Sequence, residues 1–228
     1  MSIIVICRTR NEELNIRTFC EAYHWADRIL VADGESVDRT VEIARAFSNV
    51  LVRTFDQKVL APDGETWHNP DGSHLNFLID WAHEFADLEW MIADDCDSFP
   101  TRALQNDALK ILAEWQWDVV CVRRFYLWYN GRYFPKLDVG ASPWAWRPKK
   151  WNVRATNNDF HPTVLPLPNP EQQYAWQLPD PYRLLHYSWR SEEQVQAKIK
   201  MYAAFGVPMT HPLESCGELV ELPEWAMV

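Results

Sequence analysis

Residues 3–16, IIVICRTRNEELNI, and residues 25–44, WADRILVADGESVDRTVEIA, decide the fold class of this 228-residue chain. Each stretch contains a short apolar run, Ile3–Cys7 in the first and Arg28–Ala32 in the second, which ends in polar residues. An apolar run without alternation is typical of a parallel strand that helices cover on both faces. Residues with helical spacing follow each run, so the two stretches predict strand, helix, strand and helix in that order.

The same alternation continues to about residue 100. Further strands are predicted at Val50–Thr54 and Glu89–Ala93. A helix that starts near Ser73 lies between them, because its apolar residues step by three and four. The fold class expected from this order is α/β, with a mostly parallel open sheet flanked by helices.

The second half has a different pattern, in which prolines recur from Pro135 to Pro181 and predict irregular loop with short strands. Asn130-Gly131 indicates a hairpin between two aromatic runs. Ser191 stands three residues before Gln194, the spacing of a capping box that opens a helix. The other predicted elements are an amphipathic helix at Thr101–Trp115, a strand at Val119–Phe125 and a last strand at Leu184–Ser188.

Composition and charge exclude several classes. A formal net charge of −10 argues against a general nucleic-acid binder, which needs a basic surface to replace counterions. No segment is long enough to be a transmembrane span, and the apolar run that stops at Arg8 does not have the form of a signal peptide. The five cysteines are odd in number and contain no CxxC pair, so a reduced, cytoplasmic protein is expected. Nothing in the sequence indicates an oligomeric state.

The candidate for chemistry is Ala93-Asp94-Asp95-Cys96-Asp97, directly after a predicted strand. In open α/β sheets, ligands bind beyond the carboxyl ends of the strands. Asp95 and Asp97 can share one divalent cation and leave coordination sites for water and phosphate oxygens. Acidic turns after strands are also common as solvated loops, so the pattern alone leaves both readings open.

Two other strand ends carry polar residues, Arg8 to Glu12 after the first strand and Asp33 to Ser36 after the second. Because parallel strands end at one edge of the sheet, we expect these residues to converge with the acidic cluster. Asn11 and Ser36 are also residue types that cap helices, so ordinary loops with capped helices are the alternative.

These stretches together resemble the start of family-two glycosyltransferases of the GT-A fold, in particular small bacterial members related to lipopolysaccharide core glucosyltransferases. The shared pattern is an apolar strand, a turn with Asn-Glu, then WAD-x-I-x-V-x-D and S-x-D-R-T, all within about the first hundred residues. Residues 74–82, HLNFLIDWA, are similar to the family's Arg-Asn helix, with Asn76 at the asparagine and Leu75 in place of the basic residue. Residues 93–97 stand where the family has its metal motif.

The resemblance implies a single GT-A-like domain over residues 1–228, with a nucleotide-sugar-binding half at 1–100 and an acceptor-side half at 101–228. It implies an inverting hexosyltransferase that uses a divalent metal, Mn²⁺ or Mg²⁺. The donor is then a nucleotide diphosphate sugar, and the acceptor is a glycan or another hydroxyl compound.

The resemblance also implies roles for matched residues. Residues 184–202, LLHYSWRSEEQVQAKIKMY, are similar to the family's C-terminal His-Tyr-Ser/Thr segment. His186 is therefore a candidate third metal ligand, beside Asp95 and Asp97, or a diphosphate contact. The candidates for binding the nucleotide sugar are Thr9, Arg10, Asn11, Glu12, Asp33, Glu35, Asn76 and Asp95.

The general base departs from the family pattern, in which a carboxylate follows a histidine in the second half. Here Pro162 follows His161, so Asp159 and Asp138 are the nearby candidates for the base. Aromatic residues between Phe125 and Trp151 either form a platform for an acceptor sugar or pack a small β-layer.

Two other functions remain as alternatives. Asp95-Cys96-Asp97-Ser98 resembles the nucleophile motif of haloacid-dehalogenase-type phosphatases. A non-catalytic sugar- or nucleotide-binding protein on a GT-A-like scaffold would explain the missing carboxylate after His161. Dinucleotide oxidoreductases are set aside because no GxGxxG follows the first strand.

Overall fold

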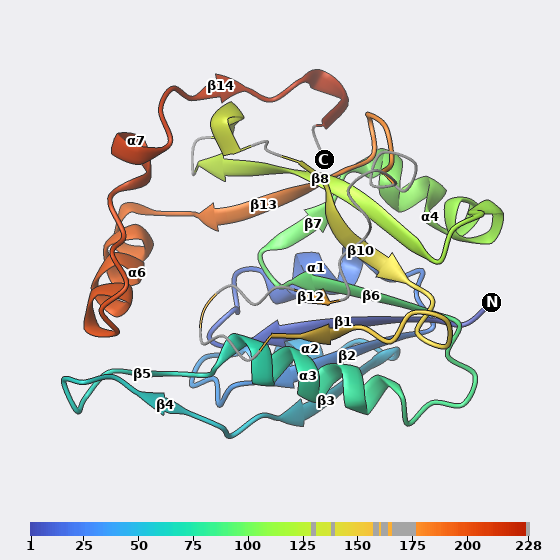
Figure 1. Ribbon diagram of the computed structural model, residues 1–228, viewed down its shortest axis with the longest axis horizontal. Coiled ribbons are helices and arrows are strands. Elements are labelled where there is room, and N and C mark those ends of the chain that lie inside the picture. Colours follow the sequence, from blue (N-terminus) through green and yellow to red (C-terminus); the bar gives the residue numbers. More distant parts are fainter. Residues whose placement is uncertain (129–130, 138–139, 157–159, 161–163, 166–176, 227–228) are drawn as a thin grey trace.

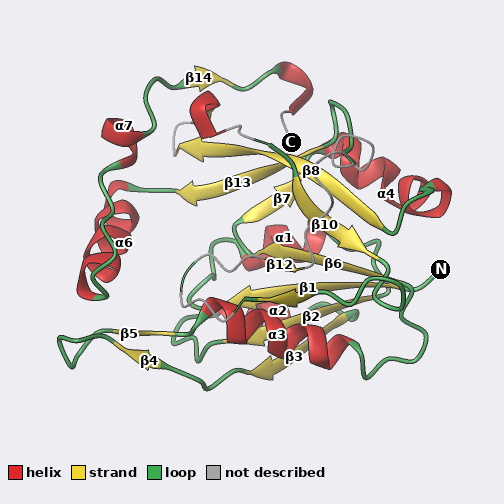
Figure 2. Ribbon diagram, in the orientation of Figure 1, coloured by secondary structure: helices red, strands yellow, loops and turns green. Residues whose placement is uncertain are grey.

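The first half of the chain has the predicted strand and helix order (Figures 1 and 2). The computed structural model describes residues 1–228 except 129–130, 138–139, 157–159, 161–163, 166–176 and 227–228. A short hairpin, β4 and β5, stands between β3 and α3 and was not predicted. The elements are β1 (Ile3–Thr9), α1 (Ile16–Ala22), β2 (Arg28–Asp33), α2 (Thr40–Ala44), β3 (Val50–Thr54), β4 (Val59–Leu60), β5 (Trp67–His68), α3 (Asp71–Ala82) and β6 (Trp90–Asp95).

The parallel part of the sheet is formed by β6, β1, β2 and β3, with β1 between β6 and β2. Successive side chains of β1 point to opposite faces. Ile3 and Val5 pack in the core that includes α1, α2 and α4 (Arg102–Glu114), whereas Ile4 and Ile6 pack in the core that includes α3. Since helices cover both faces, residues 3–7 of this strand are all apolar, and polar residues begin only at Arg8, close to the carboxyl end.

The second half adds mixed strands to the same sheet. The order is β14-β9-β8-β10-β6-β1-β2-β3, and β10 joins the halves because it pairs antiparallel with both β6 and β8. The strands of this half are β7 (Ser98–Pro100), β8 (Val119–Trp128), β9 (Arg132–Tyr133), β10 (Ser142–Trp146), β11 (Arg154–Ala155), β12 (Val164–Leu165), β13 (Arg183–Trp189) and β14 (Val220–Glu221). Of these, β11 and β12 pair with each other as a separate two-stranded sheet. The helices after β13 are α6 (Glu192–Ala204) and α7 (Pro212–Ser215), and 3-10 turns lie at Pro135–Leu137 and Glu224–Ala226.

Strand β13 is the element that connects the C-terminal segment to the acidic cluster. It lies between β7, to which it is antiparallel, and β8, to which it is parallel. His186 is level with Ser98, and the Tyr187 N–H donates a 2.7 Å hydrogen bond to the Asp97 carbonyl. The carboxyl ends of β1, β8 and β13 lie on the left in Figure 1, the side on which α6 and the β4–β5 hairpin also lie.

The sequence predicted that the strand at Leu184–Ser188 would be the last one, but a further strand follows β13. Val220 and Glu221 form β14 by pairing with Tyr133 and Arg132 of β9. Two residues give no periodic signal, so only their tertiary pairing identifies this strand.

The capping interpretation of Asn11 and Ser36 is wrong. Helices α1 and α2 begin after Asn15 and Arg39, and neither residue makes a side-chain cap bond. The Asn11 N–H donates to Ser36 Oγ (2.8 Å), and Asn11 Oδ1 accepts from the Val37 N–H (2.9 Å). These two side chains therefore tie the loop after β1 to the loop after β2.

Two other local predictions are confirmed. Ser191 caps α6, with its Oγ accepting from the Gln194 N–H at 3.2 Å. Strands β8 and β9 pair antiparallel around Gly131, whose φ of 81° favours glycine.

Most of the aromatic cluster of the second half lies in the core. Trp128, Phe134, Trp144 and Trp146 are buried. Trp144 packs in the core that includes α1 and α4, and Trp146 packs in the core that includes α3. These four residues therefore pack the β-layer and are not available as an exposed sugar platform. None of the described helices has the length and hydrophobicity that a membrane crossing requires.

Helix α4 gives a matched test of this core. Leu104 is fully buried, whereas Leu109 on the same helix is 47% exposed. We expect Leu104→Ala to lower the free energy of unfolding by about 2–5 kcal/mol, because truncation leaves a cavity. Leu109→Ala should change it by less than about 0.5 kcal/mol. Urea unfolding followed by circular dichroism measures both; equal effects would contradict the assignment of the buried face.

Candidate functional site

The acidic cluster lies where β6 ends. Asp94 and Asp95 are still within β6, and Asp97 lies in the connection to β7. One ligand atom from each of Asp95, Asp97 and His186 can be chosen so that all lie within 4.8 Å of one another. His186 Nε2 is 3.2 Å from Asp97 Oδ1. The fold thus brings together the three residues that the sequence analysis named as metal ligands.

Asp94 has a different role from its neighbours because its side chain is 0% exposed. Its carboxylate accepts hydrogen bonds from the Tyr23 hydroxyl (2.6 Å) and the Asp95 N–H (3.1 Å), and Arg124 Nη2 lies 3.9 Å away. Burial raises the pKa of Asp94 to about 6, although Arg124 and the Tyr23 hydroxyl lower it. The Asp94 side chain is therefore held in the interior beneath Asp95 and Asp97, where no ligand from solvent can contact it.

Sequence reasoning missed the partners of Asp94. The Trp144 indole N–H donates to the Tyr23 hydroxyl (3.1 Å), which completes a buried chain of polar groups from β10 through α1 to β6. The alternation of side chains along a strand was the available signal, since it places Asp94 and Asp95 on opposite faces.

Cationic groups flank Asp95 and Asp97, the two carboxylates that point outward from the sheet edge. Arg8 forms ion pairs with Asp95 (2.5 Å) and Asp71 (3.0 Å), and its position on β1 is level with Asp95 on β6. Lys198 Nζ of α6 lies 4.0 Å from Asp97 Oδ2. Burial alone would raise the pKa of Asp95 and of Asp97. The charge of Arg8 nevertheless holds the Asp95 pKa below its usual value, and His186 does the same for Asp97, so both remain ionised.

Glu12 faces the same cluster from the loop after β1. Burial, followed by the charge of Asp97, raises the pKa of Glu12 to about 7. The Asn15 amide donates a 2.6 Å hydrogen bond to its carboxylate and opposes this shift. Glu12 is therefore a fourth acidic group at this edge, as the position of its loop at the end of the first strand predicted.

The arrangement fits a divalent cation. Ligand atoms about 2.1 Å from an octahedral ion lie about 3 Å from their nearest neighbours, close to the His186–Asp97 separation. The imidazole turns Nε2 toward the carboxylates, and its Nδ1 is buried with no hydrogen-bond partner among the described residues. Two carboxylates and one imidazole suit Mn²⁺ or Mg²⁺, which prefer oxygen-rich sites.

Asp33 is buried within the turn after β2, with 4% of its surface exposed. It accepts hydrogen bonds from the Thr9 hydroxyl (3.2 Å), the Ser36 N–H (2.9 Å) and the Ser36 hydroxyl (2.5 Å). Glu35 has a φ of 60°, in the left-handed region. The carboxylate therefore fixes the shape of this turn and joins it to the end of β1.

The β4–β5 hairpin packs against both loops. The Arg10 guanidinium lies 3.4 Å from the centre of the Trp67 ring and donates to the Trp67 carbonyl (3.2 Å). Lys58 forms an ion pair with Glu35 and lies 4.1 Å from the centre of the same ring. A Cβ on Gly34 would meet Asn69 Oδ1 at 2.0 Å, so this close approach requires glycine. Trp67 and Lys58 therefore border the predicted nucleotide site, although the sequence analysis did not select them.

Asn76 is engaged with β11 and not with the acidic cluster. The Asn76 side chain donates to the Ala155 carbonyl (3.0 Å) and accepts from the Ala155 N–H (2.9 Å), which holds β11 against α3. Asp138 and Asp159 lie outside the described residues.

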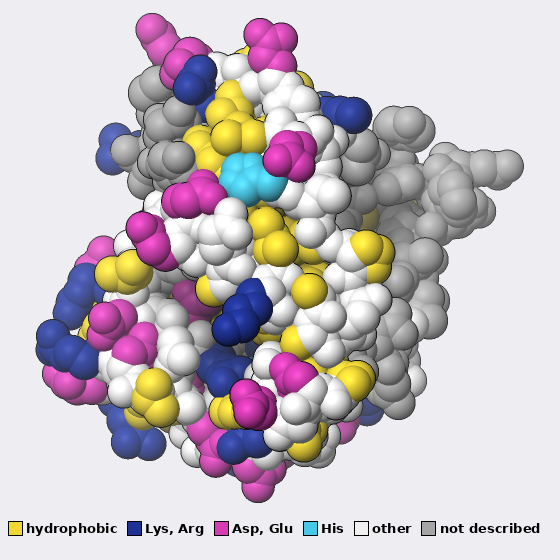
Figure 3. All heavy atoms as spheres, turned by 90° about the vertical axis from the view of Figure 1, so that its left-hand side faces the viewer, with side chains coloured by type: hydrophobic (Ala, Val, Ile, Leu, Met, Phe, Trp, Pro, Cys, Tyr) yellow, Lys and Arg dark blue, Asp and Glu magenta, His cyan; other side chains and the backbone are white. Residues whose placement is uncertain are grey.

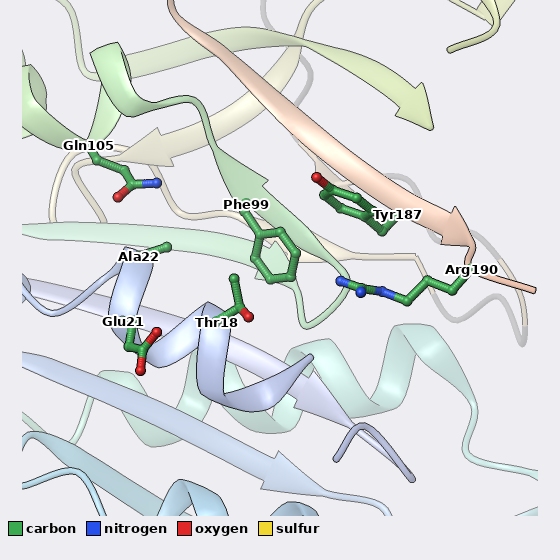
Figure 4. Close-up of a pocket in the computed structure, with 7 residues that line it drawn as sticks. All are labelled: Thr18, Glu21, Ala22, Phe99, Gln105, Tyr187 and Arg190. Carbon is green, nitrogen blue, oxygen red and sulfur yellow. The ribbon is translucent and has the colours of Figure 1, made fainter. Parts of the chain in front are cut away.

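A pocket of about 380 Å³ lies on the face of β13 opposite the one that carries His186 (Figure 4). Thr18 and Arg190 point toward Phe99 in this view. Tyr187 lines the pocket because it points to the face of β13 opposite His186. The lining residues are Thr18, Glu21, Ala22, Phe99, Gln105, Tyr187 and Arg190. None of the residues that form the acidic cluster lines this pocket.

Comparison of the sequence with protein-family models and with curated proteins gave no match. Solved structures match the fold. Residues 1–349 of S. aureus TarS align with 94% of this chain, at 17% identity and a TM-score of 0.52, over 72% of that structure. The same protein in complex with UDP-GlcNAc aligns with 90% of this chain over 64% of its own length, at 16% identity and a TM-score of 0.54.

A second solved protein is glucosyl-3-phosphoglycerate synthase from Mycobacterium tuberculosis, in complex with Mn²⁺, UDP and glucosyl-3-phosphoglycerate. It aligns with 92% of this chain over 81% of its own length, at 14% identity and a TM-score of 0.50. Both proteins are GT-A-type glycosyltransferases. The chain has a GT-A-like fold. At these sequence identities the similarity establishes the fold alone. Within this fold, the acidic cluster lies at the carboxyl ends of β1 and β6.

Replacement of Asp33 tests its part in the turn. We expect Asp33→Ala to lower the free energy of unfolding by about 1–3 kcal/mol, because the buried Thr9 hydroxyl and the partly buried donors of Ser36 lose this acceptor. Asp56, which is exposed, gives the matched control Asp56→Ala, with an expected change below about 0.5 kcal/mol. Urea unfolding without nucleotide is the measurement, and an unchanged midpoint for Asp33→Ala would contradict a structural role.

Proposed function

We propose that this chain is a metal-dependent, inverting glycosyltransferase that moves a hexose from a nucleotide diphosphate sugar to a hydroxyl acceptor. The observation that carries the proposal is the convergence of Asp95, Asp97 and His186 at the carboxyl edge of a GT-A-like sheet. Two ionised carboxylates and an imidazole form a donor set for a cation that can bind a diphosphate at the same time.

The solved structures support this choice of ligands. TarS is described in complex with UDP and with UDP-GlcNAc, and the mycobacterial synthase in complex with Mn²⁺ and UDP. We infer a uridine diphosphate sugar and Mn²⁺ as the first ligands to test on this chain. The similarity of its first hundred residues to lipopolysaccharide core glucosyltransferases further suggests a glycan acceptor.

The residues of the chain divide the work of binding. Asp95, Asp97 and His186 would hold the ion, which when bound offsets the negative charge that develops on the leaving diphosphate. The loops after β1 and β2, joined through Thr9 and Asp33, would bind the nucleoside. Arg8 keeps Asp95 ionised and oriented, since it bonds both this carboxylate and Asp71.

The chemical step we propose is a single displacement. An acceptor hydroxyl attacks the anomeric carbon, the bond from that carbon to the diphosphate oxygen breaks, and a carboxylate accepts the hydroxyl proton. One displacement inverts the configuration at that carbon. We keep Asp159 as the first candidate for the base, since it lies close to the position of the family's carboxylate, and Asp138 as the second.

The thiols agree with a reducing compartment. Cys7, Cys20, Cys96, Cys121 and Cys216 are all free, and the first four are buried. We propose a cytoplasmic location on this basis.

The metal site predicts that UDP binding depends on Mn²⁺ and on Asp97. In isothermal titration calorimetry with saturating Mn²⁺, Asp97→Asn should weaken UDP binding at least about tenfold, the range seen when metal-site groups are removed. The exposed Asp56→Asn should bind as the wild type does. Equal UDP affinities for wild type and Asp97→Asn, or equal affinities with Mn²⁺ and with EDTA, would remove the metal from the proposal.

The base is tested by turnover. Asp159→Asn should keep donor affinity and lose a factor of about 10²–10⁴ in sugar transfer, because only proton acceptance is removed. Asp138→Asn is the comparison and should lose less. Loss of transfer in Asp138→Asn alone reverses the assignment. Accumulation of a covalent phosphoenzyme in place of transfer would favour the phosphatase alternative and contradict the proposal.

A further inference from the structure

Lys198 is the cation of α6 that faces the acidic cluster. Its Nζ lies 4.0 Å from Asp97 Oδ2, and its side chain is 33% exposed. Its charge acts on Glu12 as well as on Asp97. Figure 3 shows the corresponding face, where Lys and Arg side chains border a hollow in which acidic side chains lie.

Packing at both ends of α6 fixes the position of Lys198. Val195, one turn before it, is fully buried and packs with Trp128, Phe134 and Trp189 of the second half. After it, Phe205 at the end of the helix lies edge-on to His68 of β5. The helix thus spans from the second half to the β4–β5 hairpin, and Lys198 lies between these two anchors.

Lys198 lies farther from its carboxylate partner Asp97 than Arg8 lies from Asp71 and Asp95. Arg8 is held by two carboxylates, those of Asp71 and Asp95, and both ion pairs are 3.0 Å or shorter. Lys198 is at the outer limit of an ion pair with Asp97, and its ammonium is carried on a flexible four-carbon chain. A small rotation of this chain changes which anion the ammonium contacts.

The charges explain why such a change would occur. Arg8 and Lys198 each lie beside one of the carboxylates Asp95 and Asp97, and the acidic groups Asp71 and Glu12 lie close to the same cations. A divalent metal alone adds two positive charges beside Lys198 and is opposed by it. A nucleotide diphosphate bound to that metal would bring more negative charge than the metal neutralises, so the ammonium would again have an anion to contact.

We propose that Lys198 occupies the cation position beside Asp97 before ligands bind, and contacts the donor diphosphate once the metal takes that position. This inference rests on the proposed function, because it requires the metal site and a diphosphate ligand. Helix α6 would then supply a cation that binds the diphosphate, which the carboxylates of the acidic cluster cannot do. A charge-assisted contact of an ammonium with phosphate oxygens is the interaction expected.

The proposal predicts effects of opposite sign on two ligands. Lys198→Met removes the ammonium and keeps most of the apolar chain. Mn²⁺ alone should then bind more tightly, by at least about threefold, because a like charge that lies 4.0 Å from the proposed metal ligand Asp97 is lost. UDP in the presence of saturating Mn²⁺ should bind about tenfold or more weakly, because a charged hydrogen bond to the diphosphate is lost.

The experiment measures both affinities on three proteins. Mn²⁺ binding without nucleotide is followed by the electron paramagnetic resonance signal of the free ion, and UDP binding by calorimetry with Mn²⁺ at saturation. Inorganic pyrophosphate is a second probe that does not depend on the nucleobase. Wild type is compared with Lys198→Met and with Lys200→Met, an exposed lysine two residues further along α6. Thermal unfolding checks that α6 remains folded.

Tighter Mn²⁺ and weaker UDP or pyrophosphate binding in Lys198→Met, with neither change in Lys200→Met, supports the proposal. Mn²⁺ binding by wild type with unchanged affinities in Lys198→Met overturns the role of Lys198 and leaves the proposed function intact. Loss of both affinities together indicates a structural role and also overturns it. No Mn²⁺ binding by wild type contradicts the proposed function itself, and this inference fails with it.

Discussion

The hydrogen bond from the Tyr187 N–H to the Asp97 carbonyl joins two segments that are far apart in the sequence. It belongs to the pairing of β13 with β7, which sets His186 level with Ser98. If β13 slipped by one residue, the imidazole would point to the opposite face, where Tyr187 now lines a pocket. The imidazole–carboxylate contact, the place of α6 and the approach of Lys198 all depend on this register.

A second constraint is the charge at the edge of the sheet. Carboxylates in a poorly hydrated place are stable only when cations or hydrogen-bond donors accompany them. Asp94 has the Tyr23 hydroxyl and Arg124, Asp95 has Arg8, and Asp97 has His186 and Lys198. The outward pair is thereby kept ionised in a fixed place before any ligand arrives. This edge is where the proposed function places a metal and a diphosphate together.

The fold was predictable because its signal is local. The apolar run of β1 follows from burial on both faces, and Asn11 and Ser36 stand where strands end. Sequence motifs predicted Asp95, Asp97 and His186 as metal ligands, and the structure places one ligand atom of each within 4.8 Å of the others. The pairing of β14, the buried partners of Asp94 and the stacking of Arg10 on Trp67 could not be predicted, because they depend on contacts between distant segments. Asn11 and Ser36 were given the wrong partners for the same reason, since a capping residue type does not specify which backbone group it will bond.

The central claim is that one ion is bound by residues from both halves of the chain, with His186 as its nitrogen ligand. Electron spin echo modulation of the Mn²⁺ complex measures this directly, because a directly bound imidazole nitrogen modulates the echo. The account predicts nitrogen modulation in the wild-type complex and its loss in His186→Gln. It predicts no loss in His24→Gln, which changes an exposed histidine distant from the acidic cluster in the sequence. A wild-type Mn²⁺ complex without nitrogen modulation, or one that keeps it in His186→Gln, would contradict the account.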